Sequence, residues 1–104
     1  MNLLARMSFG CLLFIGAQLP AHAEMEEGRQ AYAQTCAACH VLGVANAPKV
    51  SDREAWRPRL ATGRANLFRG VLKGKGDMPP KGGNASLSDQ EALAAMEYML
   101  SKVE

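Results

Sequence analysis

The chain has few aromatic side chains: its 104 residues include one Trp, two Tyr and three Phe. It also lacks a long apolar run, because the stretch from Phe9 to Leu19 is about half of the roughly 20 apolar residues that a membrane-spanning helix needs. No segment alternates apolar and polar residues as a β-strand does. These absences argue against a β-protein and against an integral membrane protein.

The first 23 residues instead have the three parts of a secretory signal peptide. Arg6 supplies a positive charge, the apolar stretch follows, and Ala21-His22-Ala23 is a small-x-small cleavage site. The alternatives are a retained membrane anchor and lipid attachment at Cys11, but the apolar stretch is short for an anchor, and Cys11 lies inside it rather than after it. We therefore expect cleavage after Ala23, export to the periplasm and a soluble domain of residues 24–104.

The predicted domain has 81 residues, from Glu24 to Glu104, which is marginal for folding on a hydrophobic core alone. Domains of this size usually need a disulfide, a metal or a cofactor as well. Cys36 and Cys39 are the only cysteines after the predicted signal. Because only two residues separate them, a disulfide between them would close too short a loop to stabilise a fold. Something else is expected to occupy the two thiols.

Cys36-Ala37-Ala38-Cys39-His40 has the C-x-x-C-H spacing of c-type haem attachment. Two thiols at this spacing add to the vinyl groups on one edge of a porphyrin, and the following residue brings its imidazole to the iron. A thioredoxin-like pair would need a βαβ context. A zinc site would need four ligands, whereas residues 24–104 contain no other Cys or His. The motif predicts one haem c, covalently attached through Cys36 and Cys39 and ligated by His40.

Helical patterns fill most of the remaining domain. We expect helices over about residues 26–35, 52–61 and 64–72, and a last helix that begins after residue 88. Ser88 and Glu91 form an S-x-x-E capping box at the start of the last helix. Pro58 inside the second helix removes a hydrogen bond, so this helix is expected to be kinked or partly 3₁₀.

The last helix has an apolar stripe with helical spacing. Its members are Leu93, Met96, Leu100 and Val103. We expect this stripe to face the interior of the domain.

An electron carrier usually completes its iron with a second axial ligand, and Met is the common partner of His. Met78 stands in the Gly- and Pro-rich segment 74–83, directly before two prolines. A stiff loop of this kind can fold over a haem with little conformational freedom left to lose. Met25 lies near the terminus, and Met96 and Met99 fit a core role in the last helix. We therefore predict Met78 as the second ligand of the iron.

Short segments along residues 28–101 match one known family. They are Gly28 and Tyr32, the CAACH motif, GVANAPK at 43–49, Ala55-Trp56, Pro58-Arg59, MPPKGG at 78–83, Ser88-Asp89 and Tyr98-Met99. On these segments the chain resembles the class I cytochromes c, and within them the small bacterial cytochrome c5 type.

The resemblance implies an all-α class I cytochrome c fold, with three to five helices around one covalently attached haem. The first and last helices would cross at Gly28, with Tyr32 near Tyr98. The resemblance also implies His40 and Met78 as axial ligands and a hydrogen bond from the His40 imidazole to the carbonyl of Pro48.

Two departures from the family pattern bear on the haem surroundings. Some relatives have a cysteine pair after the methionine, but this chain has Gly83-Asn84-Ala85 there, so no disulfide is expected. Residues 50–52 replace an aromatic residue and Gly-Asp. Trp56 and Arg59 fall in the stretch that would border the haem propionates, where hydrogen bonding is one role. The alternatives are a core tryptophan and a solvated arginine.

Charge is unevenly distributed along the domain. Residues 24–104 contain eleven basic and ten acidic side chains, yet the section 49–81 contains nine basic and three acidic ones. A basic surface over 49–81 would favour docking on an acidic face of a redox protein such as a terminal oxidase, reductase or peroxidase. An ordinary solvated surface is the alternative, and export together with the modest net charge argues against nucleic-acid binding.

These observations predict a mono-haem c-type cytochrome, a soluble single-electron carrier whose iron cycles between Fe(II) and Fe(III). We expect it to be a monomer or weak dimer and not an enzyme, with no small-molecule substrate, since its only His after the predicted signal is committed to iron. The alternative function is a sensor or enzyme in which the methionine is labile and the iron binds a small molecule.

Overall fold

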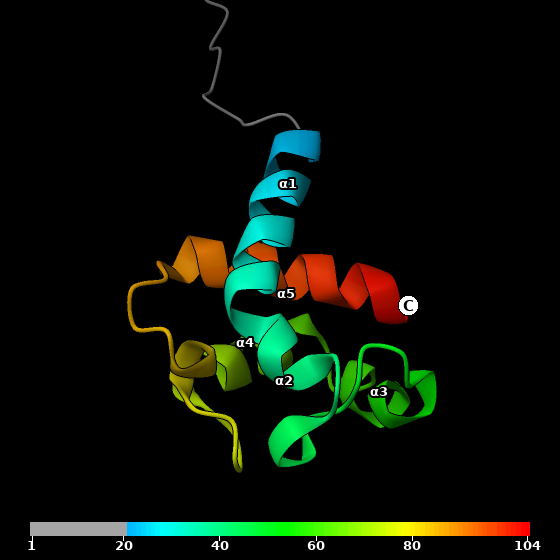
Figure 1. Ribbon diagram of the computed structural model, residues 1–104. Coiled ribbons are helices and arrows are strands. Elements are labelled where there is room, and N and C mark those ends of the chain that lie inside the picture. Colours follow the sequence, from blue (N-terminus) through cyan, green and yellow to red (C-terminus); the bar gives the residue numbers. More distant parts are fainter. Residues whose placement is uncertain (1–20) are drawn as a thin grey trace, which may run out of the picture.

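The computed structural model describes residues 21–104, and this part of the chain is built from helices and loops. The elements in chain order are α1 (Ala21–Ala31), the π-helical turn η1 (Tyr32–Cys36), α2 (Ala37–His40), the 3₁₀ turn η2 (Val44–Asn46), α3 (Arg53–Leu60), α4 (Arg64–Lys73), the 3₁₀ turn η3 (Pro80–Gly83) and α5 (Asp89–Val103) (Figure 1). The predicted all-α fold is confirmed.

The predicted signal peptide lies mostly outside the described residues, as do its apolar stretch and Cys11. The three residues before the predicted cleavage site, Ala21-His22-Ala23, form the start of α1. Among the described helices, none has both the length and the apolar character needed to cross a membrane.

The first helix extends further than the sequence predicts. It was expected over residues 26–35, but α1, η1 and α2 follow one another without a break from Ala21 to His40 (Figure 1). The π-helical turn over Tyr32–Cys36 lies in the middle of this helical stretch. The attachment motif therefore forms the end of the first helix, and no separate turn precedes it.

Helices α1 and α5 cross, and small residues allow their close approach (Figure 1). Gly28 and Ala31 are the buried residues of α1. Beyond them, the rings of Tyr32 and Tyr98 lie with their centroids 5.4 Å apart. The expected crossing of the first and last helices at Gly28 is thus confirmed.

The capping box at the start of α5 is present in full. The Glu91 amide donates to the Ser88 hydroxyl at 3.0 Å, and the Glu91 carboxylate accepts from the Ser88 amide at 3.0 Å. Both groups satisfy amides that a helix start leaves without intrahelical partners.

One member of the predicted inward stripe of α5 is wrong. Met96, Leu100 and Val103 are buried, but Leu93 is 38% exposed. The buried face also includes the small residues Ala92 and Ala95, and further along the helix Met99. With about 100° between successive residues, this broader face leaves Leu93 at its edge.

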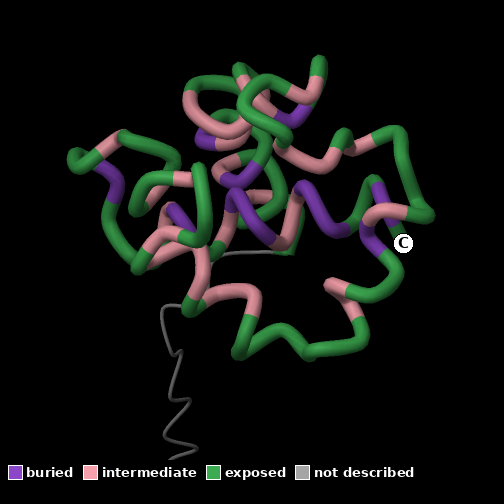
Figure 2. The backbone as a smooth tube through the Cα atoms, turned by 90° about the horizontal axis from the view of Figure 1, so that it is seen from below, coloured by how far each residue is buried: buried purple, intermediate pink, exposed green. Residues whose placement is uncertain are grey.

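The core lies between α5 and the α3–α4 pair, as the burial along the chain shows (Figure 2). Its buried side chains are Trp56, Met96, Met99, Leu100 and Val103. Helix α3 is α-helical through Pro58, so the 3₁₀ segment that was one of the two expectations there is absent, and the kink stays a prediction. Asp52 caps this helix by accepting a hydrogen bond from the Ala55 amide at 3.1 Å.

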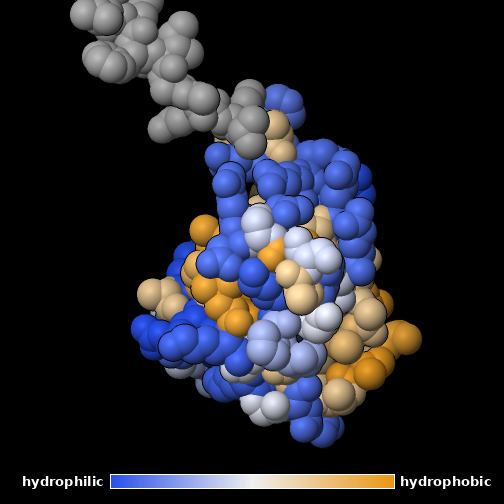
Figure 3. Space-filling view, turned by 90° about the vertical axis from the view of Figure 1, so that its left-hand side faces the viewer, coloured by the Kyte–Doolittle hydropathy of each residue, from blue (hydrophilic) through white to orange (hydrophobic). Residues whose placement is uncertain are grey.

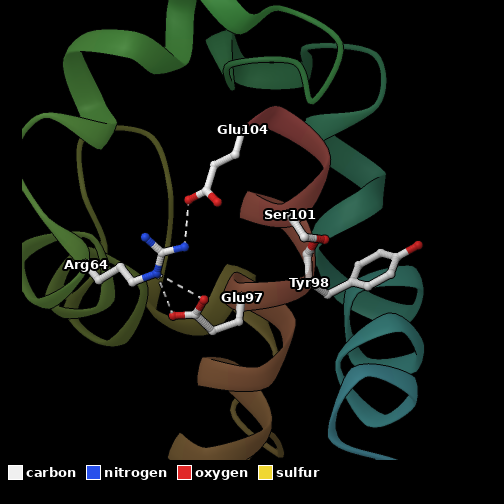
Figure 4. Close-up of polar contacts among 5 residues, drawn as sticks. All are labelled: Arg64, Glu97, Tyr98, Ser101 and Glu104. Atoms are coloured by element: carbon white, nitrogen blue, oxygen red, sulfur yellow. Dashed lines mark hydrogen bonds and ion pairs between the residues drawn. The ribbon is translucent and has the colours of Figure 1, made fainter. Parts of the chain in front are cut away.

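An arginine links the start of α4 to the second half of α5. The Arg64 Nε lies 3.1 Å from both carboxylate oxygens of Glu97, and its Nη2 lies 2.6 Å from Glu104 Oε1 (Figure 4). In the same region, the Ser101 hydroxyl donates to the Tyr98 carbonyl. The two contacts of Arg64 are ion pairs between exposed side chains, and they join α4 to the C-terminal part of the chain at the surface.

Candidate functional site

The two motif cysteines lie on the continuous first helix. Cys36 ends η1 and Cys39 lies in α2, and both are half-buried. Burial raises the pKa of the Cys36 thiol, and the neighbouring Cys39 adds to this increase. The two small residues between them, Ala37 and Ala38, keep this turn of helix free of bulky side chains.

The imidazole of His40 has a defined tautomer. Its Nδ1 lies 2.8 Å from the carbonyl oxygen of Pro48, and the side chain is buried. Because a carbonyl oxygen only accepts hydrogen bonds, Nδ1 must carry the proton. In the neutral ring this leaves the lone pair of Nε2 available as a metal ligand. The structure thus contains the hydrogen bond that the resemblance to cytochromes c implied.

Left-handed backbone conformations bring Pro48 back to His40. After α2, Gly43 has φ 79°, and Ala45 and Asn46 have φ 53° and 62°. These residues reverse the chain so that the Val50 amide donates to the His40 carbonyl at 2.8 Å. The turn therefore holds both the backbone and the side chain of His40 against the segment 48–50.

Met78 is held in a tight turn. Its amide donates to the Lys75 carbonyl and its carbonyl accepts from the Lys75 amide, both at 2.9 Å. Gly74 is required beside this turn, because a Cβ there would lie 2.8 Å from the Met78 carbonyl oxygen. Two prolines follow, and the second begins η3. The sequence predicted a stiff loop here, and the two hydrogen bonds to Lys75 are further restraints on its backbone.

The rest of the Met78 loop is held by side chains from outside the motif. The ammonium group of Lys81 donates to the Leu87 carbonyl at 2.7 Å and lies 2.9 Å from an Asp89 oxygen. The Asn84 amide donates to the Thr35 hydroxyl at 3.0 Å. Asn84 lies in the segment where some relatives have a cysteine pair, so in this chain a hydrogen bond links the loop to the first helix.

Cys36, His40 and Met78 line one cavity, whose remaining wall is mainly apolar. The other lining residues are Val71, Lys81, Gly82, Leu87, Ala92, Met96 and Met99. A thiol for covalent attachment, an imidazole with a free Nε2 lone pair and a thioether thus converge in apolar surroundings. This donor set fits an iron porphyrin, because imidazole and thioether are the axial ligands of electron-transfer haems.

Sequence reasoning missed several lining residues. Leu87 is the clearest case, since it is 6% exposed and packs with Ala31 and Ala95. The pattern that would have found it is the hydrophobic staple, in which a residue before the N-cap packs near the fourth helical residue, here Ala92. Met96 and Met99, which were assigned to the core, lie in the core and also line the cavity.

Trp56 and Arg59 both donate hydrogen bonds to backbone carbonyls. The Trp56 Nε1 donates to the Lys49 carbonyl at 2.9 Å, and the Arg59 guanidinium donates to the Ala55 carbonyl. Trp56 is also a core residue, as one of the two alternatives predicted. Contacts of these side chains with haem propionates stay predictions.

The surface has exposed apolar side chains beside the motif and a basic groove elsewhere. Val41, Leu42 and Val44, directly after His40, are exposed. On another part of the surface, Arg69, Lys73 and Lys75 line an open groove. Figure 3, which views the side that carries the segment after α4, shows apolar patches on a mostly polar surface.

Comparisons with known proteins agree with this site. Residues 23–99 match the family described as cytochrome C oxidase, cbb3-type, subunit III. The chain is 44% identical over 79 residues to cytochrome c-555 of Chlorobaculum tepidum, covering 72% of this chain and 73% of that protein. It is 43% identical over 74 residues to cytochrome c5 of Azotobacter vinelandii, covering 69% of this chain and 89% of that protein.

A solved structure has the same fold. It is described as an electron transfer complex of nitrite reductase with cytochrome c, and the matching chain is 44% identical with a TM-score of 0.71. The match covers 84% of this chain and all of the other. Since the family match, the relatives and the cavity around Cys36, His40 and Met78 all agree, the chain belongs to the small class I c-type cytochromes, which hold one covalently attached haem c.

Proposed function

We propose that this cytochrome carries single electrons between redox proteins, with His40 and Met78 as the two axial ligands of its haem iron. The observation that carries the proposal is that both side chains line the same apolar cavity as Cys36. When bound, the haem supplies an iron centre that accepts and releases one electron. The function of the chain is then to keep His40 and Met78 bound to the iron in both its oxidised and its reduced form.

Each side chain has a separate role in this proposal. Cys36 and Cys39 tether the porphyrin covalently, so the carrier does not lose its cofactor. His40 presents Nε2, because the Pro48 carbonyl holds the proton on Nδ1. Met78 supplies a soft thioether, which raises the reduction potential. With both axial positions filled, the iron has no open position for a substrate.

The ligand set is tested by replacing Met78 with Ala in the haem-loaded protein. We expect the near-infrared charge-transfer band of the ferric Met-ligated iron to disappear and the reduction potential to fall. Met25→Ala is the matched control, because Met25 is exposed near the start of α1. A Met78→Ala protein that keeps the band and the potential would show that another residue is the ligand.

The alternative function, a sensor or enzyme with an open iron, makes the opposite prediction for the wild-type protein. Such a protein would show a high-spin ferric spectrum or would bind CO at once after reduction. A carrier with both axial positions filled is expected to be low-spin and to resist CO.

We further propose that residues 1–23 are a cleavable signal and that the domain of residues 24–104 acts in the periplasm. The described part of α1 supports this boundary. Its first buried residue is Gly28, so none of the described residues before the boundary, Ala21 to Ala23, is buried. The intact mass of the periplasmic protein tests the boundary: a chain that begins at Glu24 supports it, and a chain that retains Ala21–Ala23 contradicts it.

We also propose that the partners are redox enzymes, such as a terminal oxidase, reductase or peroxidase, and that docking uses the basic region 49–81. The basic groove of Arg69, Lys73 and Lys75 supports this, since cationic side chains on one surface steer an acidic partner. Lys73→Glu is expected to slow reduction of an acidic partner at low salt and to have little effect at high salt. An equal slowing at all salt concentrations would argue against docking at this groove.

A further inference from the structure

We infer that Trp56 is a positioning residue for the iron ligand His40, and that it acts through the backbone of Lys49. The inference rests on the proposed ligation of iron by His40. It assigns the indole N–H a role that is separate from the packing of the tryptophan ring in the core.

Three successive residues form the connection between the two side chains. The Pro48 carbonyl accepts from His40 Nδ1 at 2.8 Å, the Lys49 carbonyl accepts from Trp56 Nε1 at 2.9 Å, and the Val50 amide donates to the His40 carbonyl at 2.8 Å. Within the segment 48–50, the first and third residues are thus hydrogen-bonded to His40, and the middle residue is hydrogen-bonded to Trp56.

The Lys49 carbonyl is held in place by two hydrogen bonds. It accepts a second hydrogen bond from the Asp52 amide at 2.9 Å, and Asp52 in turn caps α3, the helix that carries Trp56. Proline also fixes its own φ, which leaves the backbone before Lys49 with little freedom. When the direction of the Lys49 carbonyl is set, the direction of the neighbouring Pro48 carbonyl is therefore restricted as well.

Trp56 is suited to hold the Lys49 carbonyl because it is itself immobile. Its side chain is 4% exposed and packs with Met96, Met99 and Leu100. Its ring also lies beside the imidazole of His40, with centroids 5.8 Å apart and planes tilted by 40°. The tryptophan therefore restrains His40 twice, through the ring contact and through the Lys49 carbonyl.

The consequence for the iron follows from the Nδ1 hydrogen bond. A carbonyl that accepts this proton strongly makes the imidazole a stronger electron donor at Nε2. A stronger donor stabilises Fe(III) over Fe(II) and lowers the reduction potential. Loss of the indole N–H would let the segment 48–50 move, weaken the bond at Nδ1 and raise the potential.

The chain has a single tryptophan, which allows a selective test in the haem-loaded protein. Biosynthetic replacement of Trp56 with benzothienylalanine removes the N–H and keeps the shape of the ring. We expect the reduction potential to rise and the His40 Nδ1 proton, followed by NMR in the reduced protein, to exchange with solvent about fivefold faster. Trp56→Phe is expected to shift both quantities in the same direction.

Val103→Ala is the matched control, because Val103 is buried in the same core cluster but lies outside the segment 48–50. It is expected to lower the melting temperature without changing the potential or the proton exchange. Wild-type potential and exchange in the benzothienylalanine protein would overturn the inference, as would equal shifts in Val103→Ala. In NMR spectra of the oxidised, unaltered protein, strongly shifted imidazole ring protons report ligation of Fe(III) by His40 separately, so failure of that ligation is distinguishable from failure of this inference.

Discussion

The backbone of Gly28 in α1 lies directly against the carbonyl group of Ala94 in α5: a Cβ added to Gly28 would stand 2.3 Å from that oxygen. A backbone oxygen cannot move aside as a flexible side chain can. The two helices would have to separate, which would also loosen the nearby Tyr32–Tyr98 contact. The crossing of α1 and α5 therefore depends on glycine at this position.

We expect Gly28→Ala to lower the free energy of unfolding by about 1–3 kcal/mol, although alanine is the better helix former. Gly70→Ala in α4 is the matched control, because its nearest neighbour would be 3.9 Å from the added Cβ. That change is expected to stabilise the protein by about 0.5–1 kcal/mol. Chemical denaturation of the haem-loaded variants measures both, and effects of the same sign would contradict the prediction.

Leu100 and Leu93 lie on the same helix but differ in burial. Leu100 is fully buried, whereas Leu93 is 38% exposed. We expect Leu100→Ala to cost about 2–5 kcal/mol of unfolding free energy, because it opens a cavity in the core. Leu93→Ala should lower the free energy of unfolding by clearly less than Leu100→Ala does. Similar costs would show that Leu93 is buried in the haem-loaded protein, as the simple helical stripe predicted.

Lys81 is expected to keep the Met78 loop closed. Lys81→Met removes the donor to the Leu87 carbonyl and the ion pair with Asp89. Leaving that carbonyl without a partner should cost about 1–3 kcal/mol of unfolding free energy. Because the loop then opens more often, cyanide should displace the methionine ligand faster. Lys75→Met, an exposed position in the same loop, is the control and should keep the wild-type displacement rate.

The capping box of α5 predicts a pH dependence. The Ser88 amide, followed by the Ser88 side chain and Lys81, holds the pKa of Glu91 below its ordinary value of 4.5. A carboxyl group whose pKa is lower in the folded state stabilises the fold fully above the unfolded value. This stabilisation is lost as the pH falls through the folded pKa.

Glu91→Gln keeps an oxygen acceptor for the Ser88 amide but does not titrate in this range. The variant should melt slightly below the wild-type protein at neutral pH, and the difference should shrink as the pH falls below about 4.5. Thermal melts across this range provide the test. Parallel curves for the two proteins would show that the Glu91 charge contributes nothing.

Several features of the fold could be predicted because their determinants are local. Ser88 and Glu91 predict a helix start within four residues of sequence, and Gly63 and Gly74 bound α4 at positions with φ 89° and 81°. The C-x-x-C-H motif likewise contains its chemistry in five consecutive residues. Such features need no knowledge of the rest of the fold.

Other features depend on residues that are distant in sequence. The hydrogen bond between Asn84 and Thr35 spans 49 residues, and the bonds of Trp56 and Lys81 end on backbone carbonyls, which are present in every residue and so leave no mark in the sequence. The exposure of Leu93 depends on which face of α5 the other helices cover. These relationships appear only when the helices are packed.

The π-helical turn at Tyr32–Cys36 changes the direction in which the side chains beyond it point from the first helix. Before the turn, Gly28 and Ala31 face α5, whereas Cys36 at its end and His40 beyond it line the cavity. If the same residues formed regular α-helix instead, everything beyond the turn would rotate by about 100° relative to the upstream half. The wider turn thus lets one continuous helix pack Gly28 against α5 and still direct His40 into the cavity.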